Sequence, residues 1–206
     1  MTWLGNAVGV SHAYMHQLRT GAKSNPNMDL VLKLADCMEV HPAYFVGGRR
    51  DRAPGSLPKR TFADKLNTLF KLVHPASAGE FTNNHVVVSV RTKGREQQQQ
   101  GWTISAAALE QYRAGTNPNP GLIHILALAD VFGAPPAYFF DDELADNIDE
   151  QLETRWAMAS FGVEQLIMRA NTEKLRPSVR RSLLAALAAA FKPNSDAEDE
   201  DGRPGT

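Results

Sequence analysis

The chain has 206 residues, of which 43% are hydrophobic and 22% charged, with a formal net charge of −1 at pH 7. This length fits one or two ordinary domains with a real hydrophobic core. The single cysteine, Cys37, excludes an internal disulfide. No apolar run approaches the roughly 18–20 residues of a membrane span and no signal peptide is recognisable, so we expect a cytoplasmic protein without a membrane partner.

Charge is distributed unevenly along the chain. Residues 1–60 contain eight basic and four acidic side chains, a balance of +4, whereas residues 141–206 contain eight and fourteen, a balance of −6. A basic first part and an acidic last part suit a protein that meets an anionic partner at one end. Chance clustering is the alternative explanation.

Residues 11–45 and 105–139 are two copies of one sequence at a constant offset of 94 positions. The identities include Gln17 with Gln111 and Arg19 with Arg113, and both copies end on Pro-Ala-Tyr-Phe. An internal repeat fixes the domain plan. We therefore expect two similar all-α modules, at residues 1–46 and 61–140.

In the first copy, a short helix over residues 3–8 is ended by Gly9, because glycine adopts the left-handed conformation of a helix stop. Ser11 can cap the next helix by accepting from its free backbone N–H groups. A small residue, a glycine turn and a polar cap predict a helix-turn-helix. Pro42 then opens a short last helix, in which we expect Tyr44 and Phe45 to be core aromatics.

The helix that usually precedes a helix-turn-helix is missing from the first copy. Either the start of the chain is placed too far downstream, or another segment supplies that packing. Residues 47–60 follow as a linker, with Gly, Pro and five basic residues. This linker is either a solvated tether or a basic arm that lies along DNA phosphates.

The second copy is preceded by an amphipathic helix predicted over residues 62–73. Residues 85–93 are ambiguous, because β-branching favours a strand whereas the repeat favours a helix, which we adopt. Gly94 takes the role of Gly9, and the polar insert 95–101 is expected to form an expanded, mobile turn.

Residues 141–192 are predicted to form helices that make a homodimer, because their apolar stripes need a partner. Asp141 and Asp142 suit a helix N-terminus, and residues 193–206 form an acidic, disordered tail that is a candidate surface for another protein. The candidate dimerisation residues are Leu144, Ile148, Leu152, Trp156, Val179, Leu183, Leu187 and Phe191.

In a helix-turn-helix, the first turn of the second helix meets base edges and the following loop meets phosphates. The first copy then offers a cap, four base-facing residues and four residues for the DNA backbone: Ser11; His12, Ala13, His16 and Gln17; Tyr14, Arg19, Lys23 and Asn25. The second copy offers fewer donors and a repelling Glu110; its candidates are Ser105, Ala107, Gln111, Arg113, Asn117 and Asn119. A metal site on His12 and His16 lacks further ligands, so we expect none.

Residues 61–192 resemble the EspR-type regulators of actinobacteria. The resemblance rests on the spacing of Phe62-Ala63, Leu66-Asn67 and Leu69-Phe70, on Gln111–Gly115 with Asn117-Pro118, and most specifically on Ala137-Tyr138-Phe139 with Asp141-Asp142-Glu143. It implies a Cro/repressor-type (XRE) helix-turn-helix, a C-terminal dimerisation domain and a DNA-binding regulator, with Gln111 and Arg113 facing DNA. The insert 95–101 and the module at 1–46 depart from that plan and leave open which copy reads the operator.

The leading hypothesis is a homodimeric transcription factor that reads or bridges double-stranded DNA sites in the nucleoid. The alternative is a protein-interaction module, such as an antitoxin, anti-repressor or scaffold, that kept the fold without strong DNA binding. No catalytic constellation is recognisable, so we expect no enzyme activity and no cofactor.

Overall fold

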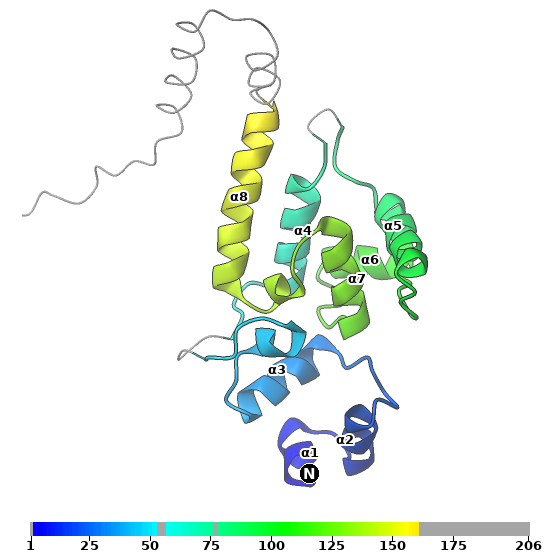
Figure 1. Ribbon diagram of the computed structural model, residues 1–206, viewed down its shortest axis with the longest axis vertical. Coiled ribbons are helices and arrows are strands. Elements are labelled where there is room, and N and C mark those ends of the chain that lie inside the picture. Colours follow the sequence, from blue (N-terminus) through cyan, green and yellow to red (C-terminus); the bar gives the residue numbers. More distant parts are fainter. Residues whose placement is uncertain (1, 53–56, 76–77, 161–206) are drawn as a thin grey trace, which may run out of the picture. The chain divides into compact units, whose positions relative to one another are not determined.

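The computed structural model describes residues 2–52, 57–75 and 78–160, which belong to one compact unit, residues 1–160 (Figure 1). Every regular element in these residues is helical, which confirms the expected all-α class. None of the helices in these ranges is long and apolar enough to cross a membrane. Residues 161–206 lie outside the described residues.

The first repeat forms four short helices: α1 (Thr2–Val8), α2 (His12–Arg19), α3 (Met28–Cys37) and the 3-10 helix η1 (Pro42–Val46). The helix expected over residues 3–8 corresponds to α1, which begins one residue earlier. Gly9 separates α1 from α2 with a φ of 75°, a conformation that favours glycine. The Ser11 side chain accepts from the Tyr14 N–H at 3.2 Å, which confirms the expected cap of α2.

The second repeat has one more helix in front and one behind: α4 (Phe62–Leu72), α5 (Asn83–Glu96), α6 (Ala106–Arg113), α7 (Leu122–Phe132), η2 (Pro136–Phe139) and α8 (Asp142–Ser160). The bounds of α2 and α6 differ by the same 94 positions as the sequence repeat. Ser105 accepts from the Ala108 N–H at 3.1 Å, as Ser11 does in the first repeat.

The segment 85–93 is helical within α5, which confirms the choice made from the repeat over the β-branched pattern. The role expected for Gly94 is wrong, because α5 continues through this glycine to Glu96. The lack of a side chain at Gly94 instead allows Trp102 to pack closely against α5. A Cβ at position 94 would lie only 2.7 Å from the Trp102 Cβ. The turn before α6 is made by Gln98 and Gly101, which have φ values of 54° and 86°.

The main hydrophobic core lies under α4, which packs on the second repeat. Phe62 lies 4.8 Å from Phe139 between ring centroids, and Phe70 lies 5.0 Å from Phe132. Among the described residues the first repeat has no helix in the position of α4. Its smaller core is built around Val8, Met15 and Leu30.

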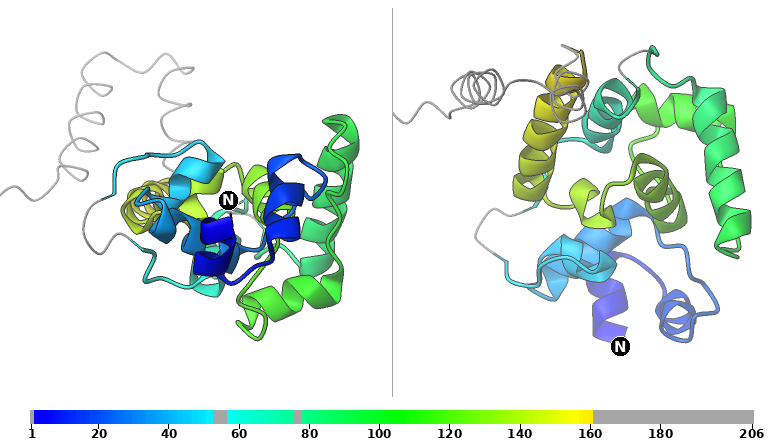
Figure 2. Two further views of the ribbon diagram at one scale, coloured as in Figure 1. Left: turned by 90° about the horizontal axis from the view of Figure 1, so that it is seen from below. Right: turned by 45° about the horizontal axis from the view of Figure 1, so that its top comes forward.

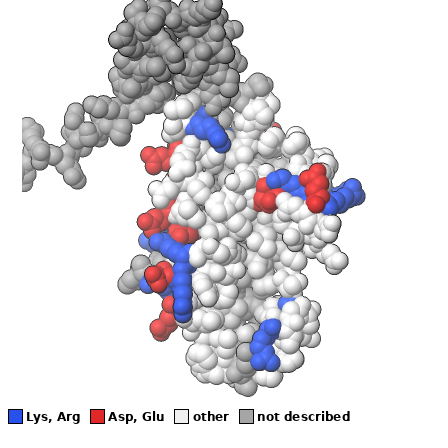
Figure 3. Space-filling view, in the orientation of Figure 1, with Lys and Arg blue, Asp and Glu red and all other residues white. Residues whose placement is uncertain are grey.

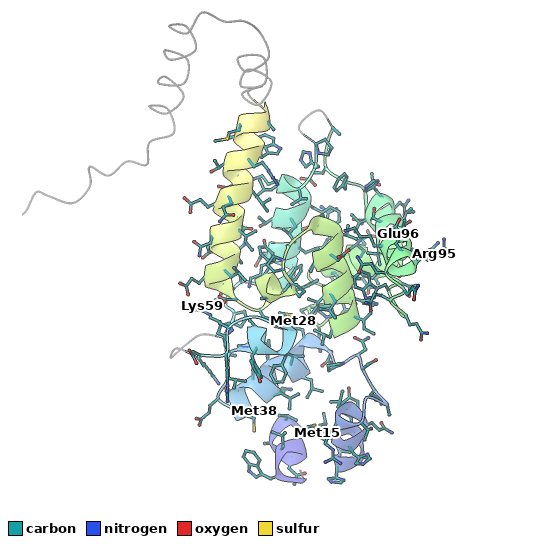
Figure 4. The ribbon with its side chains drawn as sticks, viewed as in Figure 1. Met15, Met28, Met38, Lys59, Arg95 and Glu96 are labelled. Atoms are coloured by element: carbon teal, nitrogen blue, oxygen red, sulfur yellow. The ribbon has the colours of Figure 1, made fainter. Side chains whose placement is uncertain are left out.

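The expectation that Tyr44 and Phe45 are core aromatics is wrong, because no described helix covers them as α4 covers their counterparts. Their side chains are 46% and 36% exposed, whereas the equivalent Tyr138 and Phe139 are fully buried beneath α4. Met38, at the end of α3, is also exposed (Figure 4). The same Tyr-Phe pair is therefore part of the core in one repeat and part of the surface in the other.

The described parts of the linker are held by ion pairs rather than free. Arg49 contacts Asp141 and Glu143 at 2.7 Å, and Arg60 contacts Asp146 and Asp149 at 2.7 Å. Arg52 binds Asp36 at 2.6 Å. Figure 3 shows the resulting row of mixed charges beside α8. These contacts argue against a basic arm on DNA, because three of the four linker arginines already face carboxylates of the same chain.

Candidate functional site

The helix α2 presents one polar face to solvent. His12, Ala13, His16 and Gln17 are exposed, while Met15 is buried between α1 and α2 (Figure 4). The opposite face is anchored by packing, so the exposed face has a fixed orientation. Within the described ranges, no group of three or more His, Cys, Asp or Glu side chains is arranged to hold a metal.

The loop after α2 adds positive charge beside this face. The Lys23 N–H donates to the Gln17 carbonyl at 3.1 Å, and the Lys23 ammonium lies 4.6 Å from the centre of the Tyr14 ring. A cation over an aromatic ring is held without being neutralised. Arg19 is exposed at the end of the same helix.

Residues 2–28, which form α1, α2 and the following loop, contain no Asp or Glu. In Figure 3, the lowest part of the molecule accordingly shows basic side chains without acidic ones. Elsewhere on the same face, basic and acidic side chains lie next to one another. The charge on this end of the unit therefore favours an anionic partner.

The equivalent helix α6 is poorer in donors, as expected. Ala107, Glu110 and Gln111 are exposed, and Leu109 and Tyr112 are buried beneath them. The Tyr112 hydroxyl lies 2.8 Å from His124 Nδ1, which ties α6 to α7. Burial raises the pKa of Tyr112 and lowers the pKa of His124, so both groups are kept neutral near pH 7.

The Arg113 side chain is partly buried and binds residues of the second repeat. Its guanidinium donates to Asn67 and Asn83 at 3.0 Å, approaches Glu80 at 3.5 Å, and stacks 3.9 Å above Phe70. These partners occupy the nitrogens that a phosphate or a base would need. The geometry therefore favours a structural role for Arg113.

Two of the candidate asparagines hold the repeats together. The Asn25 Oδ1 accepts from the Ile123 N–H, and the Asn119 Oδ1 accepts from the Asp29 N–H, both at 2.9 Å. Asn117 instead holds the loop after α6, since its backbone N–H donates to the Gln111 carbonyl at 3.2 Å. This is the counterpart of the bond from Lys23 to Gln17.

The candidate dimerisation residues of α8 fall into two groups. Leu144, Ile148 and Leu152 are partly buried against the core of their own chain, whereas Trp156 is 40% exposed. Ile148 and Leu152 also line a cavity of about 460 Å³ next to Gly133. Val179, Leu183, Leu187 and Phe191 lie outside the described residues, as does the acidic tail 193–206.

The sequence reasoning missed the segments that join the two repeats. Asn27 and Gly121 form an antiparallel bridge, flanked by backbone bonds from Met28 to Pro120 and from Leu122 to Pro26. The only signal for this pairing was the Asn-Pro dipeptide that both copies keep at 25–26 and 119–120. From the sequence alone, Asn25 and Asn119 are instead expected to contact DNA.

These features define an all-helical protein in which a capped, exposed helix recurs in two copies. No family model matches the chain. The chain is 35% identical over 111 residues to the nucleoid-associated protein EspR of Mycobacterium tuberculosis, in both strain CDC 1551 / Oshkosh and strain H37Rv. The matched segment covers 54% of this chain and 79% of EspR. The chain belongs to the EspR family.

Proposed function

We propose that this protein is a DNA-binding, nucleoid-associated transcriptional regulator. The observation that carries the proposal is the exposed, capped α2 in a segment without acidic residues, in a chain of the EspR family. The nucleoid is a cytoplasmic body of DNA and protein, so family membership also supports a cytoplasmic location.

In this proposal, α1 and α2 form a helix-turn-helix whose second helix enters the major groove. Gln17 can bind adenine through two hydrogen bonds, His12 and His16 can donate to guanine or phosphate, and Ala13 can contact a thymine methyl group. Arg19 and Lys23 then neutralise phosphates, because both lie beside the exposed face of α2.

The second repeat is proposed to contribute through α6. Gln111 and Ala107 are exposed at the positions of Gln17 and Ala13, and support contact with the same kinds of base edge. Glu110 opposes phosphate, so this helix contributes less affinity than α2. Ser11 and Ser105 act as helix caps that orient backbone N–H groups, since both side chains accept within their own helices.

A homodimer is the second part of the proposal. Leu144, Ile148 and Leu152 are already packed within the chain, so the exposed Trp156 and the apolar residues from Val179 to Phe191 are the better candidates for the contact. Leu183→Asp should then halve the mass seen in sedimentation. An unchanged mass would rule out this contact.

The primary test is the affinity of the full-length protein for duplex DNA at several salt concentrations. Phosphate binding releases counterions, so affinity should fall steeply with salt, and removal of Arg19 should reduce the slope by about 0.9. Gln17→Ala should cost about 1–3 kcal/mol on a selected site. Gln151→Ala, at an exposed position on α8, is the matched control and should leave affinity unchanged.

A second candidate function is a protein-interaction module, such as an antitoxin, anti-repressor or scaffold. It is favoured by the two alanines and the exposed glutamate on α6, and by the acidic tail as a surface for another protein. Absence of DNA binding at low salt would favour this candidate over the regulator. We propose neither an enzyme activity nor a cofactor.

A further inference from the structure

The two repeats are joined by a reciprocal set of backbone bonds. The Met28 N–H donates to the Pro120 carbonyl at 2.9 Å, and the Leu122 N–H donates to the Pro26 carbonyl at 2.8 Å. The two bonds are equivalent under the repeat, because Met28 corresponds to Leu122 and Pro120 corresponds to Pro26. Such reciprocity is the mark of a two-fold interface, in which residue i contacts j and j contacts i.

Side chains obey the same symmetry. The bonds of Asn25 and Asn119 to the opposite repeat are also exchanged by the offset of 94. Gly48 lies where Ala43 and its counterpart Ala137 meet, since a Cβ at position 48 would lie 2.6 Å and 2.9 Å from their Cβ atoms. η1 and η2 also pack on one another. The repeats therefore form an internal pseudo-dimer.

The paired segments follow directly after α2 and α6. Each connecting loop is fastened to its helix in the same way, through the bonds from Lys23 to Gln17 and from Asn117 to Gln111. The pairing therefore fixes the orientation of one helix relative to the other. Figures 1 and 2 show α2 and α6 on the same side of the pair formed by α3 and α7.

We propose that a single chain presents α2 and α6 as a preformed pair, and so binds one duplex DNA site made of two inverted half-sites. This proposal rests on the DNA-binding function above. Pseudo-two-fold symmetry of the protein implies inverted symmetry of the site, with half-sites about one helical turn apart. One polypeptide thus does what ordinarily takes two subunits.

The two half-sites are not identical. Gln17 and Gln111 are exposed at equivalent positions, so each half-site contains an adenine at the matching place. His16 is replaced by Glu110, and His12 by Ala106, so the half-site under α6 is read through fewer hydrogen bonds. The expected target is an imperfect inverted repeat with a dominant half.

The test uses the full-length protein with DNA obtained by selection from random duplexes. The expected motif has two inverted halves, and saturation should occur at one chain per duplex, at DNA concentrations far above the dissociation constant. Scrambling either half should weaken binding at least tenfold. Because the proposed homodimer can bring a second chain to the duplex, the stoichiometry is also measured with Leu183→Asp. A motif with one half only, or two chains of this variant for each site, would overturn the proposal.

Gly121→Ala tests the pairing itself. Its Cβ would lie 2.6 Å from the Asn25 side chain, and the backbone at position 121 is not left-handed, so the change strains the contact between repeats and little else. Affinity for the complete site should fall at least tenfold, whereas affinity for an isolated dominant half-site should not change. Equal affinity of variant and wild type for the complete site would contradict the proposal.

Two controls separate the possible failures. Gly79→Ala adds the same methyl group at an exposed glycine with open space around it, and should behave as wild type. If Gly121→Ala does not fold, the combined change Asn25→Ala and Asn119→Ala removes both acceptors without adding atoms, and should give the same loss. If wild type shows no salt-dependent binding to any duplex, the proposed function fails and not merely the pairing.

Discussion

Asn25 and Asn119 occupy equivalent positions in the two repeats, and each accepts a hydrogen bond from a backbone N–H of the other repeat at 2.9 Å. Both are followed by proline, which supplies the carbonyl for the next bond across the interface. These loops, which the sequence predicts to contact DNA, thus hold α2 and α6 in one arrangement. Asn25 and Asn119 therefore contribute to the contact between the two repeats.

Replacing either asparagine by alanine should therefore reduce stability. A typical intramolecular hydrogen bond contributes about 1 kcal/mol, and the loss here should be of that size, because the donors are partly solvated and regain water. The midpoint of urea denaturation measures it. The two changes lie in one interface, so the double variant should deviate from additivity; strictly additive losses would argue against a shared interface.

Arg113 and Gln111 should separate stability from DNA binding. Arg113→Ala removes two charge-assisted hydrogen bonds and the stacking on Phe70, and should destabilise the protein by about 2–3 kcal/mol. Gln111→Ala, at an exposed position in the same helix, should leave the melting temperature unchanged and weaken binding to the selected site. The reverse pattern would place Arg113 on DNA after all.

The unequal burial of the repeated Tyr-Phe pair gives a matched comparison. Phe139→Ala should cost about 3–5 kcal/mol, because Phe139 is fully buried against Phe62. Phe45→Ala removes the same atoms from a side chain that is 36% exposed, and should cost about 1 kcal/mol or less. Chemical denaturation of both variants measures the difference. Similar losses would mean that the first repeat has a covering partner of its own.

Local signals explain why much of this fold was predictable. Ser11 and Ser105 cap their helices through bonds to residues three positions away, so the sequence near each cap contains all of the information. Tyr44 and Tyr138 have the same neighbours in sequence, yet only Tyr138 is covered, because α4 packs on one repeat alone. No local pattern in residues 42–45 could reveal that difference.

The partners that Arg113 and Asn25 bind within the chain could not be predicted from the sequence, for a related reason. Arg113 binds Asn67, 46 positions away, and Asn25 binds Ile123, 98 positions away. Both residues are polar and lie in or next to a predicted recognition element, so the sequence favoured DNA as their partner. Only the tertiary structure distinguishes a polar side chain that faces solvent from one that joins two segments.

His41 makes stability depend on pH. Its side chain is almost fully buried, and its Nδ1 accepts from the Ala43 N–H at 3.2 Å, so the ring is neutral at this position. Burial is the largest cause that lowers the pKa of His41, and the charges of Arg49 and Arg52 add to it, whereas Asp141 acts in the opposite direction. The folded state therefore binds this proton less readily than the unfolded state.

The sign of the effect follows from linkage. The contribution of His41 is fully present above its ordinary pKa of 6.5, and is lost as the pH falls from there through the lowered value. Stability should thus decrease as the pH falls from about 7 through the lowered pKa of His41. His41→Asn keeps a capping oxygen without a titrating ring, and should flatten that decrease in urea midpoints. The control His12→Asn, at an exposed position on α2, should retain the decrease; an equally steep decrease in His41→Asn would assign it to other groups, His124 first.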